Sequence, residues 1–268
     1  MTTAKKNTNK TEITVGYEFT TAQGCNASVI EDNGSRNLVI KFTETGNTKT
    51  VPRSSVKTGR IKNPMKPYVE GIGYIGVGKY KEGTTAYKKW AAMLSRCYGK
   101  EMKNAYIDVT VCKEWRNYQN FAKWFHEESN YQDGWQLDKD ILSRGQRIYS
   151  PNTCLFVPKG VNISYGKDPT KATLPKRNRI KSLTGKTRVI YKGQTLGTND
   201  DELANINLRL CKLEDTFNLL FKIGDKHPLT LQALESLENQ IRQLDADYIE
   251  ADSKIFLEKT NETNSNQK

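Results

Sequence analysis

The sequence predicts an α+β protein built from a small N-terminal β-meander or SH3-like module, a mixed α/β core with a ββα-type element, and a C-terminal antiparallel helical hairpin. Three patterns support this class. Short β-prone runs separated by turn residues come first, aromatic residues at helical spacing follow, and two apolar heptad seams end the chain. The expected boundaries are 1–10 (disordered), 11–66 (β-rich accessory module), 67–166 (mixed core), 167–198 (basic linker or arm), 199–260 (acidic helical hairpin) and 261–268 (disordered tail).

Four short strands are expected in the N-terminal module. Asn33-Gly34 is a strong hairpin signal, because these residues accept the positive φ angles of a two-residue turn. Leu38, Ile40 and Phe42 alternate with other side chains, which predicts one buried face. The charge of this module is modest, so we treat it as an accessory domain. Its expected strands cover 14–20, 26–31, 37–43 and 48–56.

Two helices are expected in the middle of the chain. Thr84 or Thr85 can cap the first helix, over 86–98, and a glycine follows it. The second helix is expected over 114–128, where aromatic residues recur at helical spacing. A glycine-rich segment, 71–83, precedes both helices. It lacks the GxxxxGK[ST] motif, so we interpret it as a linker or hairpin and not as a phosphate-binding loop.

Charge is divided unevenly along the chain, which carries 42 Lys and Arg against 30 Asp and Glu, a net of +12. Residues 1–199 hold 34 basic and 16 acidic residues, a net of +18. Residues 200–268 hold 8 and 14, a net of −6. A basic surplus of this size indicates a polyanionic partner, and nucleic acid is the usual one. We therefore expect DNA to bind the first three quarters of the chain.

The most basic stretch runs from Lys167 to Lys192, where nine cations accompany a single acidic residue, Asp168. Such a stretch is either a solvated linker or an arm that follows the phosphate backbone. Its expected phosphate contacts are Lys171, Lys176, Arg177, Arg179, Lys181, Lys186 and Arg188.

The segment 135–162 is the part of the chain that is best suited to form a catalytic or metal-binding site. A short apolar strand ends in Asp138-Lys139-Asp140, and a turn at Gly145 reverses the chain. A second strand over 155–157 then leads toward a short helix. Carboxylate and amide oxygens of this kind are ligands that Mg²⁺ prefers. The amides are Asn152, in the loop before the second strand, and Asn162, beyond it.

A pattern of aromatic, apolar and polar residues extends from about Thr85 to Asn162. Its residues are Tyr87, Trp90, Met93-Leu94, Arg96-Cys97-Tyr98, Val111-Cys112, Glu114-Trp115, Phe121, Trp124, Leu137-Asp138-Lys139-Asp140-Ile141, Tyr149-Ser150-Pro151, Cys154-Leu155-Phe156-Val157-Pro158 and Asn162. With this pattern, the chain resembles phage-encoded proteins of the HNH (His-Me finger) endonuclease group. The resemblance covers about 80 residues and implies that 67–166 form an HNH-like nuclease core.

The resemblance implies a metal-dependent DNA endonuclease that hydrolyses phosphodiester bonds with Mg²⁺ or Mn²⁺. Asp138, Asp140 and Asn162 fall at the metal-ligand positions, and Asn152 falls at the middle Asn of the pattern. Asp140, Asn152 and Lys139 are the implied catalytic residues. Lys139, Arg144 and Arg147 are the expected phosphate contacts near the site.

The sequence departs from the HNH pattern at its first position, where Asp-Lys-Asp stands in place of the catalytic histidine. Asp140 could act as the base or as a second metal ligand, although an aspartate is a weak base unless its pKa is raised. Lys139 could contact the phosphate, or act as the base if its pKa is lowered. His126 could be recruited instead. The remaining alternative is a non-catalytic protein that binds nucleic acid or another protein and retains a degenerate HNH-like fold.

The five cysteines are odd in number and include no CxxC pair, which favours reduced thiols. A zinc site formed by Cys97, Cys112, Cys154 and His126 lacks paired spacing, so zinc is not expected. No apolar run is long enough to cross a membrane, and the N-terminus has no secretory signal. We expect a cytoplasmic protein without membrane contact, in the host cytoplasm if the chain is phage-encoded.

Two heptad seams predict the C-terminal hairpin, and Gly224 and Pro228 break the helix between them. The helices either bury their own seams or use the longer one to contact a second copy or another protein. The first seam is Leu203, Ile206, Leu210, Leu213, Phe217 and Leu220, and the second is Leu234, Leu237, Ile241, Leu244, Tyr248, Ala251 and Ile255.

Overall fold

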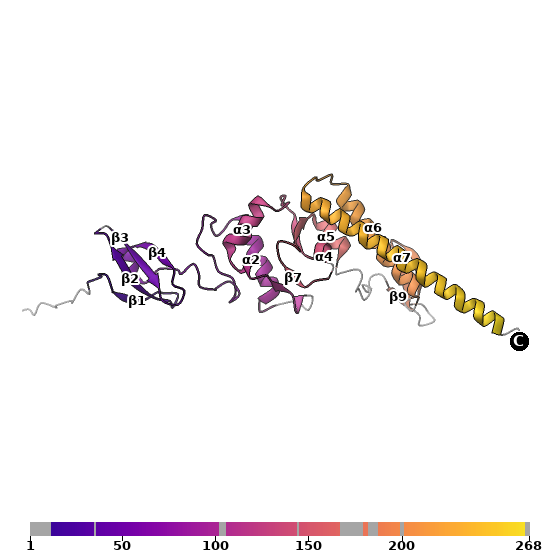
Figure 1. The fold of residues 1–268 in the computed structure, drawn as a ribbon, viewed down its shortest axis with the longest axis horizontal. Coiled ribbons are helices and arrows are strands. Elements are labelled where there is room, and N and C mark those ends of the chain that lie inside the picture. Colours follow the sequence, from indigo (N-terminus) through magenta and orange to yellow (C-terminus); the bar gives the residue numbers. More distant parts are fainter. Residues whose placement is uncertain are drawn as a thin grey trace, which may run out of the picture.

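The computed structural model describes residues 12–34, 36–101, 106–143, 145–166, 179–181, 187–198 and 201–265. The molecule is an elongated α+β structure, with the N-terminal sheet, a central helical core and a C-terminal pair of helices arranged along its long axis (Figure 1). The α+β class that the sequence predicts is confirmed. The expected disordered segment 1–10 lies outside the described residues.

The N-terminal sheet is a four-stranded antiparallel meander, in which neighbouring strands follow chain order. Its core includes Leu38, Ile40 and Phe42, which alternate on one face as predicted. The last strand is shorter than expected, because a helix begins directly after Pro52, which has no N–H to donate to a strand. The elements are β1 (Glu18–Thr20), β2 (Asn26–Asp32), β3 (Asn37–Phe42), β4 (Thr48–Pro52) and α1 (Arg53–Thr58).

Aromatic residues form the central core, in which Trp90, Trp115, Tyr118 and Phe121 are fully buried. Thr84 caps the first helix through its hydroxyl oxygen, as the sequence predicts. The expected helix over 114–128 is divided in two, because Asn117 is extended and its side chain caps the second part. The elements are α2 (Thr85–Tyr98), β5 (Thr110–Val111), η2 (Glu114–Arg116), α3 (Tyr118–Glu127) and β7 (Ile148–Tyr149), and β7 pairs with β5 in parallel.

The glycine-rich segment 71–83 packs against the N-terminal end of α3. A Cβ atom at Gly76, where φ is 74°, would lie 2.1 Å from the Asn117 side chain, and one at Gly78 would lie 2.2 Å from Gln119. The Gln119 amide hydrogen-bonds the backbone N–H and C=O of Tyr80. These glycines therefore serve close packing.

A two-stranded antiparallel unit followed by a helix lies between the central core and the C-terminal helices. In its register, Asp138 pairs with Leu155, and Leu137 pairs with Phe156. A helix of one turn, α4, follows the first strand and begins at Asp140. The helix that ends this unit, α5, packs against the first strand. The elements are β6 (Gln136–Asp138), α4 (Asp140–Ser143), β8 (Leu155–Val157) and α5 (Lys159–Tyr165).

A three-stranded antiparallel sheet lies within the stretch predicted as a basic linker or arm. Its central strand places Val189 against Ala204 and Leu208 of the following helix. This contact ties the sheet to the C-terminal hairpin. The strands are β9 (Arg179–Lys181), β10 (Thr187–Tyr191) and β11 (Gln194–Thr198).

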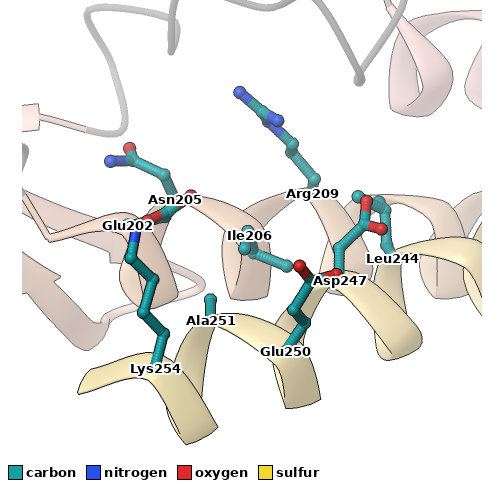
Figure 2. Close-up of a pocket in the computed structure, with 9 residues that line it drawn as sticks. All are labelled: Glu202, Asn205, Ile206, Arg209, Leu244, Asp247, Glu250, Ala251 and Lys254. Carbon is teal, nitrogen blue, oxygen red and sulfur yellow. The ribbon is translucent and has the colours of Figure 1, made fainter. Parts of the chain in front are cut away.

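The C-terminal helices α6 (Glu202–Phe221) and α7 (Pro228–Ser265) pack side by side and run in opposite directions. In Figure 2, the Glu202 end of α6 lies beside Ala251 and Lys254 of α7, and the Arg209 end lies beside Leu244, although the Arg209 side chain points away from α7. α7 continues through 261–265, the first part of the tail that the sequence predicts to be disordered, and residues 266–268 lie outside the described residues. None of the described helices combines the length and apolar character needed to cross a membrane.

Candidate active site

The residues of the Asp138-Lys139-Asp140 segment lie together where β6 passes into α4. Asp138 is 3% exposed, and its Oδ1 accepts hydrogen bonds from the backbone N–H groups of Asp140 (2.9 Å) and Ile141 (3.0 Å). Both N–H groups belong to the first turn of α4, where no helical carbonyl can accept from them. Asp138 therefore holds the start of α4 in place.

Burial raises the pKa of Asp138 to about 6, and repulsion from the Asp140 carboxylate adds to this rise. The two backbone hydrogen bonds and the charge of Lys139 oppose it. A buried carboxyl whose pKa is raised beside a second carboxylate is typical of sites that bind cations or transfer protons. Burial and the neighbouring Asp140 carboxylate together bring the pKa of Asp138 to about 6, within reach of physiological pH.

Lys139 forms an ion pair with Asp140, in which Nζ lies 2.5 Å from Oδ1. The Lys139 side chain is 9% exposed, whereas that of Asp140 is 27% exposed. The Lys139 ammonium also lies 5.8 Å from the ring centroid of Tyr149, and the guanidinium of Arg96 lies 5.6 Å from the same ring. Lys139 is therefore held in place by a carboxylate and an aromatic ring, with little access to solvent.

The two asparagines occupy different environments. The side-chain N–H of Asn162, on α5, donates a hydrogen bond of 2.8 Å to Oε1 of Gln136 on β6. Gln136 and Asp138 are two residues apart on a strand, so they share one face of β6. Asn152 is exposed in the turn between β7 and β8. The structure thus brings Asp138, Lys139 and Asp140 together and connects Asn162 to the same strand, while Asn152 faces solvent.

The predicted phosphate contacts are distributed over several parts of the chain. Arg147 is exposed, and its guanidinium donates to the backbone oxygen of Ile107. Arg188 is exposed on β10, and Arg179 and Lys181 belong to β9. Five of the predicted contacts lie outside the described residues, namely Arg144, Lys171, Lys176, Arg177 and Lys186.

The C-terminal hairpin supports α4 through contacts that the sequence did not reveal. The Ser236 hydroxyl on α7 donates a hydrogen bond of 3.0 Å to the backbone oxygen of Ile141. The Tyr165 hydroxyl on α5 lies 3.2 Å from the backbone oxygen of Asp140 and 3.0 Å from Oε1 of Gln240. Ser236 and Gln240 are polar residues four positions apart, and they lie beside an apolar seam. This pair of polar residues is the only signal of the contact in the sequence.

The acidic segment offers donors that suit Mg²⁺ or Mn²⁺ in chemistry, since carboxylate and amide oxygens are hard ligands. The donors are the carboxylates of Asp138 and Asp140 and the amide of Asn162. Across the described ranges, no group of three or more His, Cys, Asp or Glu side chains is placed to hold a metal ion. A cation site here would therefore depend on these two carboxylates and one amide.

The histidine and cysteines that the sequence offered as alternatives have other surroundings. His126 is exposed on α3 and stacks on Tyr80, with 5.3 Å between the ring centroids. Burial raises the pKa of Cys97 and of Cys112 to about 11, and it also raises the pKa of Cys154. Cys97 and Cys154 are buried, whereas His126 lies on the exposed side of α3.

No match to this chain was found among protein-family models, curated proteins or solved structures. The resemblance to the HNH group therefore stays a prediction from the residues.

Proposed function

We propose that the protein is a metal-dependent DNA endonuclease of the HNH type, with its site at the junction of β6 and α4. The observation that carries this proposal is the shielded pair of carboxylates, Asp138 and Asp140, at the end of the first strand of a strand–strand–helix unit. The helix of that unit, α5, carries Asn162 and packs against the same strand. The basic surplus of residues 1–199 supplies the attraction for DNA.

Asp138, Asp140 and Asn162 would hold a Mg²⁺ or Mn²⁺ ion. When bound, such an ion stabilises the charge that develops on the scissile phosphate. Among the chain's own residues, Asp138 orients α4 through its two backbone hydrogen bonds. Arg147 would contact the phosphate and Asn152 would contact substrate, since both are exposed. Lys139 would hold Asp140 in place through their ion pair. We place this activity in the cytoplasm.

The proposal is tested by incubating the full chain with plasmid and phage DNA in Mg²⁺ or Mn²⁺. The parent protein should nick or cut the DNA, and EDTA should abolish cleavage. Asn162→Ala and Asp140→Asn should each lower the rate at least about 10-fold, as expected for the loss of a metal ligand or its support. Circular dichroism verifies that each variant is folded.

A matched control is Asp133→Asn, since Asp133 is an exposed carboxylate shortly before β6. This variant should cleave DNA at the parent rate. Absence of metal-dependent cleavage by a folded parent protein would contradict the proposal, as would equal rates for the control and the Asp140 variant.

A second candidate is a protein that binds nucleic acid without cutting it. The Lys139–Asp140 ion pair favours it, because the ammonium at 2.5 Å occupies a carboxylate oxygen that a metal would need. Lys139→Met removes this competitor. Stronger Mn²⁺ binding by that variant in calorimetry, together with no cleavage by the parent, would support this second function.

A further inference from the structure

A hollow of about 480 Å³ lies where the N-terminal module meets the segment that leads to the central core. It is distant in sequence from the Asp138–Asp140 segment, and its lining is chemically different. The floor is apolar, the rim carries two cations, and one wall is an aromatic ring. The lining residues are Ala22, Gln23, Arg60, Ile61, Lys62 and Tyr68.

Backbone and side-chain hydrogen bonds fix the walls of this hollow. The N–H of Ala22 donates to the backbone oxygen of Gly59 (2.8 Å), in a turn where Gly59 has a φ of 64°. Oε1 of Gln23 accepts from the N–H of Asn63 (2.8 Å), and its backbone oxygen accepts from Nζ of Lys66 (2.9 Å). A site held in this way loses little conformational entropy when a ligand binds.

The hollow lies in a basic part of the chain. Residues 45–69 contain six cations and no Asp or Glu. Arg53 pairs with Asp32 at 2.6 Å, whereas Lys62 is 70% exposed and forms a longer ion pair with Glu82 at 3.8 Å. Behind Lys62, the Nζ of Lys49 donates to the backbone oxygen of Lys62 (3.0 Å), although Lys49 does not itself line the hollow. The two cations of the rim favour an anionic ligand.

The aromatic wall, Tyr68, is partly exposed to solvent. Tyr68 is 38% exposed, and its N–H donates to the backbone oxygen of Gly73 (2.9 Å). Its hydroxyl interacts with Tyr87 and Glu82, which anchors the edge of the ring. The Lys62 ammonium lies 5.7 Å from the ring centroid. A ring anchored at its edge and flanked by cations matches the way proteins hold unpaired bases, by stacking beside phosphate contacts.

We infer that this hollow binds an unpaired stretch of nucleic acid, with a base stacked on Tyr68 and the neighbouring phosphates on Arg60 and Lys62. An acidic peptide would satisfy the cations but would leave the ring and the apolar floor unfilled. A base pair within a duplex keeps its faces stacked, so it cannot offer one to Tyr68. The site lies outside the proposed catalytic segment and makes the N-terminal module a nucleic-acid contact.

The test measures binding of the full chain to a fluorescent dT₂₀ oligonucleotide in EDTA, so that the result does not depend on cleavage. Tyr68→Ala should weaken binding about 10-fold, and Tyr68→Phe should stay within about 2-fold of the parent, because stacking needs the ring. Arg60→Ala/Lys62→Ala should flatten the slope of log K against log[salt] by about 1.4, or about 0.7 per cation.

A matched control is Lys41→Ala/Lys57→Ala, which removes two exposed cations of the same module that do not line the hollow. It should leave the Tyr68 contact intact. That contact is read directly by irradiating the complex with dT₂₀ containing 5-iodouracil and mapping the crosslinked peptide by mass spectrometry. The crosslink should fall on Tyr68 in the parent and in this control, and duplex DNA of the same length should not give it.

Three results would overturn the inference. The first is a dT₂₀ affinity that does not change in Tyr68→Ala. The second is an equal loss of duplex binding in that variant, since the ring would then not be reading an unpaired base. The third is a polyglutamate peptide that binds the hollow while dT₂₀ does not, which would make it a peptide site. None of these results bears on whether the Asp138–Asp140 segment cuts DNA.

Discussion

The Asp138–Asp140 segment and the Tyr68 hollow both contain charged side chains, but these are shielded from solvent in the segment and exposed to solvent in the hollow. The segment is shielded, and each charge has a partner within the chain: Lys139 pairs with Asp140, and backbone N–H groups bond Asp138. In the hollow, Lys62 is largely exposed, and its ion pair with Glu82 is longer, at 3.8 Å, and open to solvent. Shielded charges stabilise the fold and change their pKa values, whereas exposed charges mainly attract ligands. The predictions below test this contrast, from the largest effect to the smallest.

Removing Asp140 should have the largest effect on stability, because it leaves the shielded Lys139 ammonium without its partner. We expect Asp140→Ala to lower the free energy of unfolding by about 3 kcal/mol, as when one member of a buried ion pair is lost. Urea denaturation measures this change. Asp140→Ala/Lys139→Met should recover most of the loss. A loss below about 0.5 kcal/mol would mean that the pair behaves like an exposed one.

The raised pKa of Asp138 should make stability depend on pH. Its pKa is about 6 in the folded chain, against an ordinary value of 3.8 for an aspartate in the unfolded chain, so the folded state binds more protons between these values. Stability should therefore fall by roughly 2 kcal/mol as the pH rises from about 4 to about 6. Asp138→Asn keeps an oxygen acceptor for α4 and should remove this fall. Thermal unfolding of both proteins across this range measures it, and identical profiles would contradict the assignment.

Removing a contact between the C-terminal hairpin and α4 should lower stability by a moderate amount. Ser236→Ala removes the hydrogen bond to Ile141, and we expect a loss of about 1 kcal/mol in the free energy of unfolding. Ser253→Ala is the matched control, because Ser253 is an exposed serine on the same helix. It should change stability by less than about 0.5 kcal/mol. Equal losses in the two variants would show that Ser236 does not brace the site.

Removing the two cations at the rim of the hollow should have the smallest effect on stability. Arg60→Ala/Lys62→Ala should change the free energy of unfolding by less than about 0.5 kcal/mol, because exposed charges contribute little to the fold. The same variant should bind dT₂₀ less tightly at low salt. A large loss of stability would place these cations in the same structural class as Lys139, and the contrast between the two regions would then fail.

Local patterns in the sequence were sufficient to predict most of the strands and helices. The alternation of Leu38, Ile40 and Phe42 predicted the sheet face, and the cap at Thr84 predicted the start of α2. The break after Phe221 and the second heptad seam predicted the helical pair. These predictions succeed because periodicity and capping depend on residues close in the chain.

Local patterns were weakest where a remote contact decides the structure. The small sheet β9–β11 lies in a stretch that reads as a basic arm, and it packs Val189 on Ala204 and Leu208 of α6. The helix expected over 114–128 is divided into η2 and α3, and the glycine-rich segment before α2 packs beside Asn117 and Gln119 at the point of division. Neither effect has a local signal, since the partners are many residues away.

The sequence alone determined the class of the protein, the uneven charge of its two parts and the acidic segment on which the proposed chemistry depends. The tertiary structure decided what that segment is. It showed that Asp138 caps α4, that Asp140 is paired with Lys139, and that Ser236 of α7 holds the same turn from nearly a hundred residues away. It also placed Tyr68 beside Arg60 and Lys62. Burial and distance between remote residues set these roles, and neither quantity is encoded in the local order of residues.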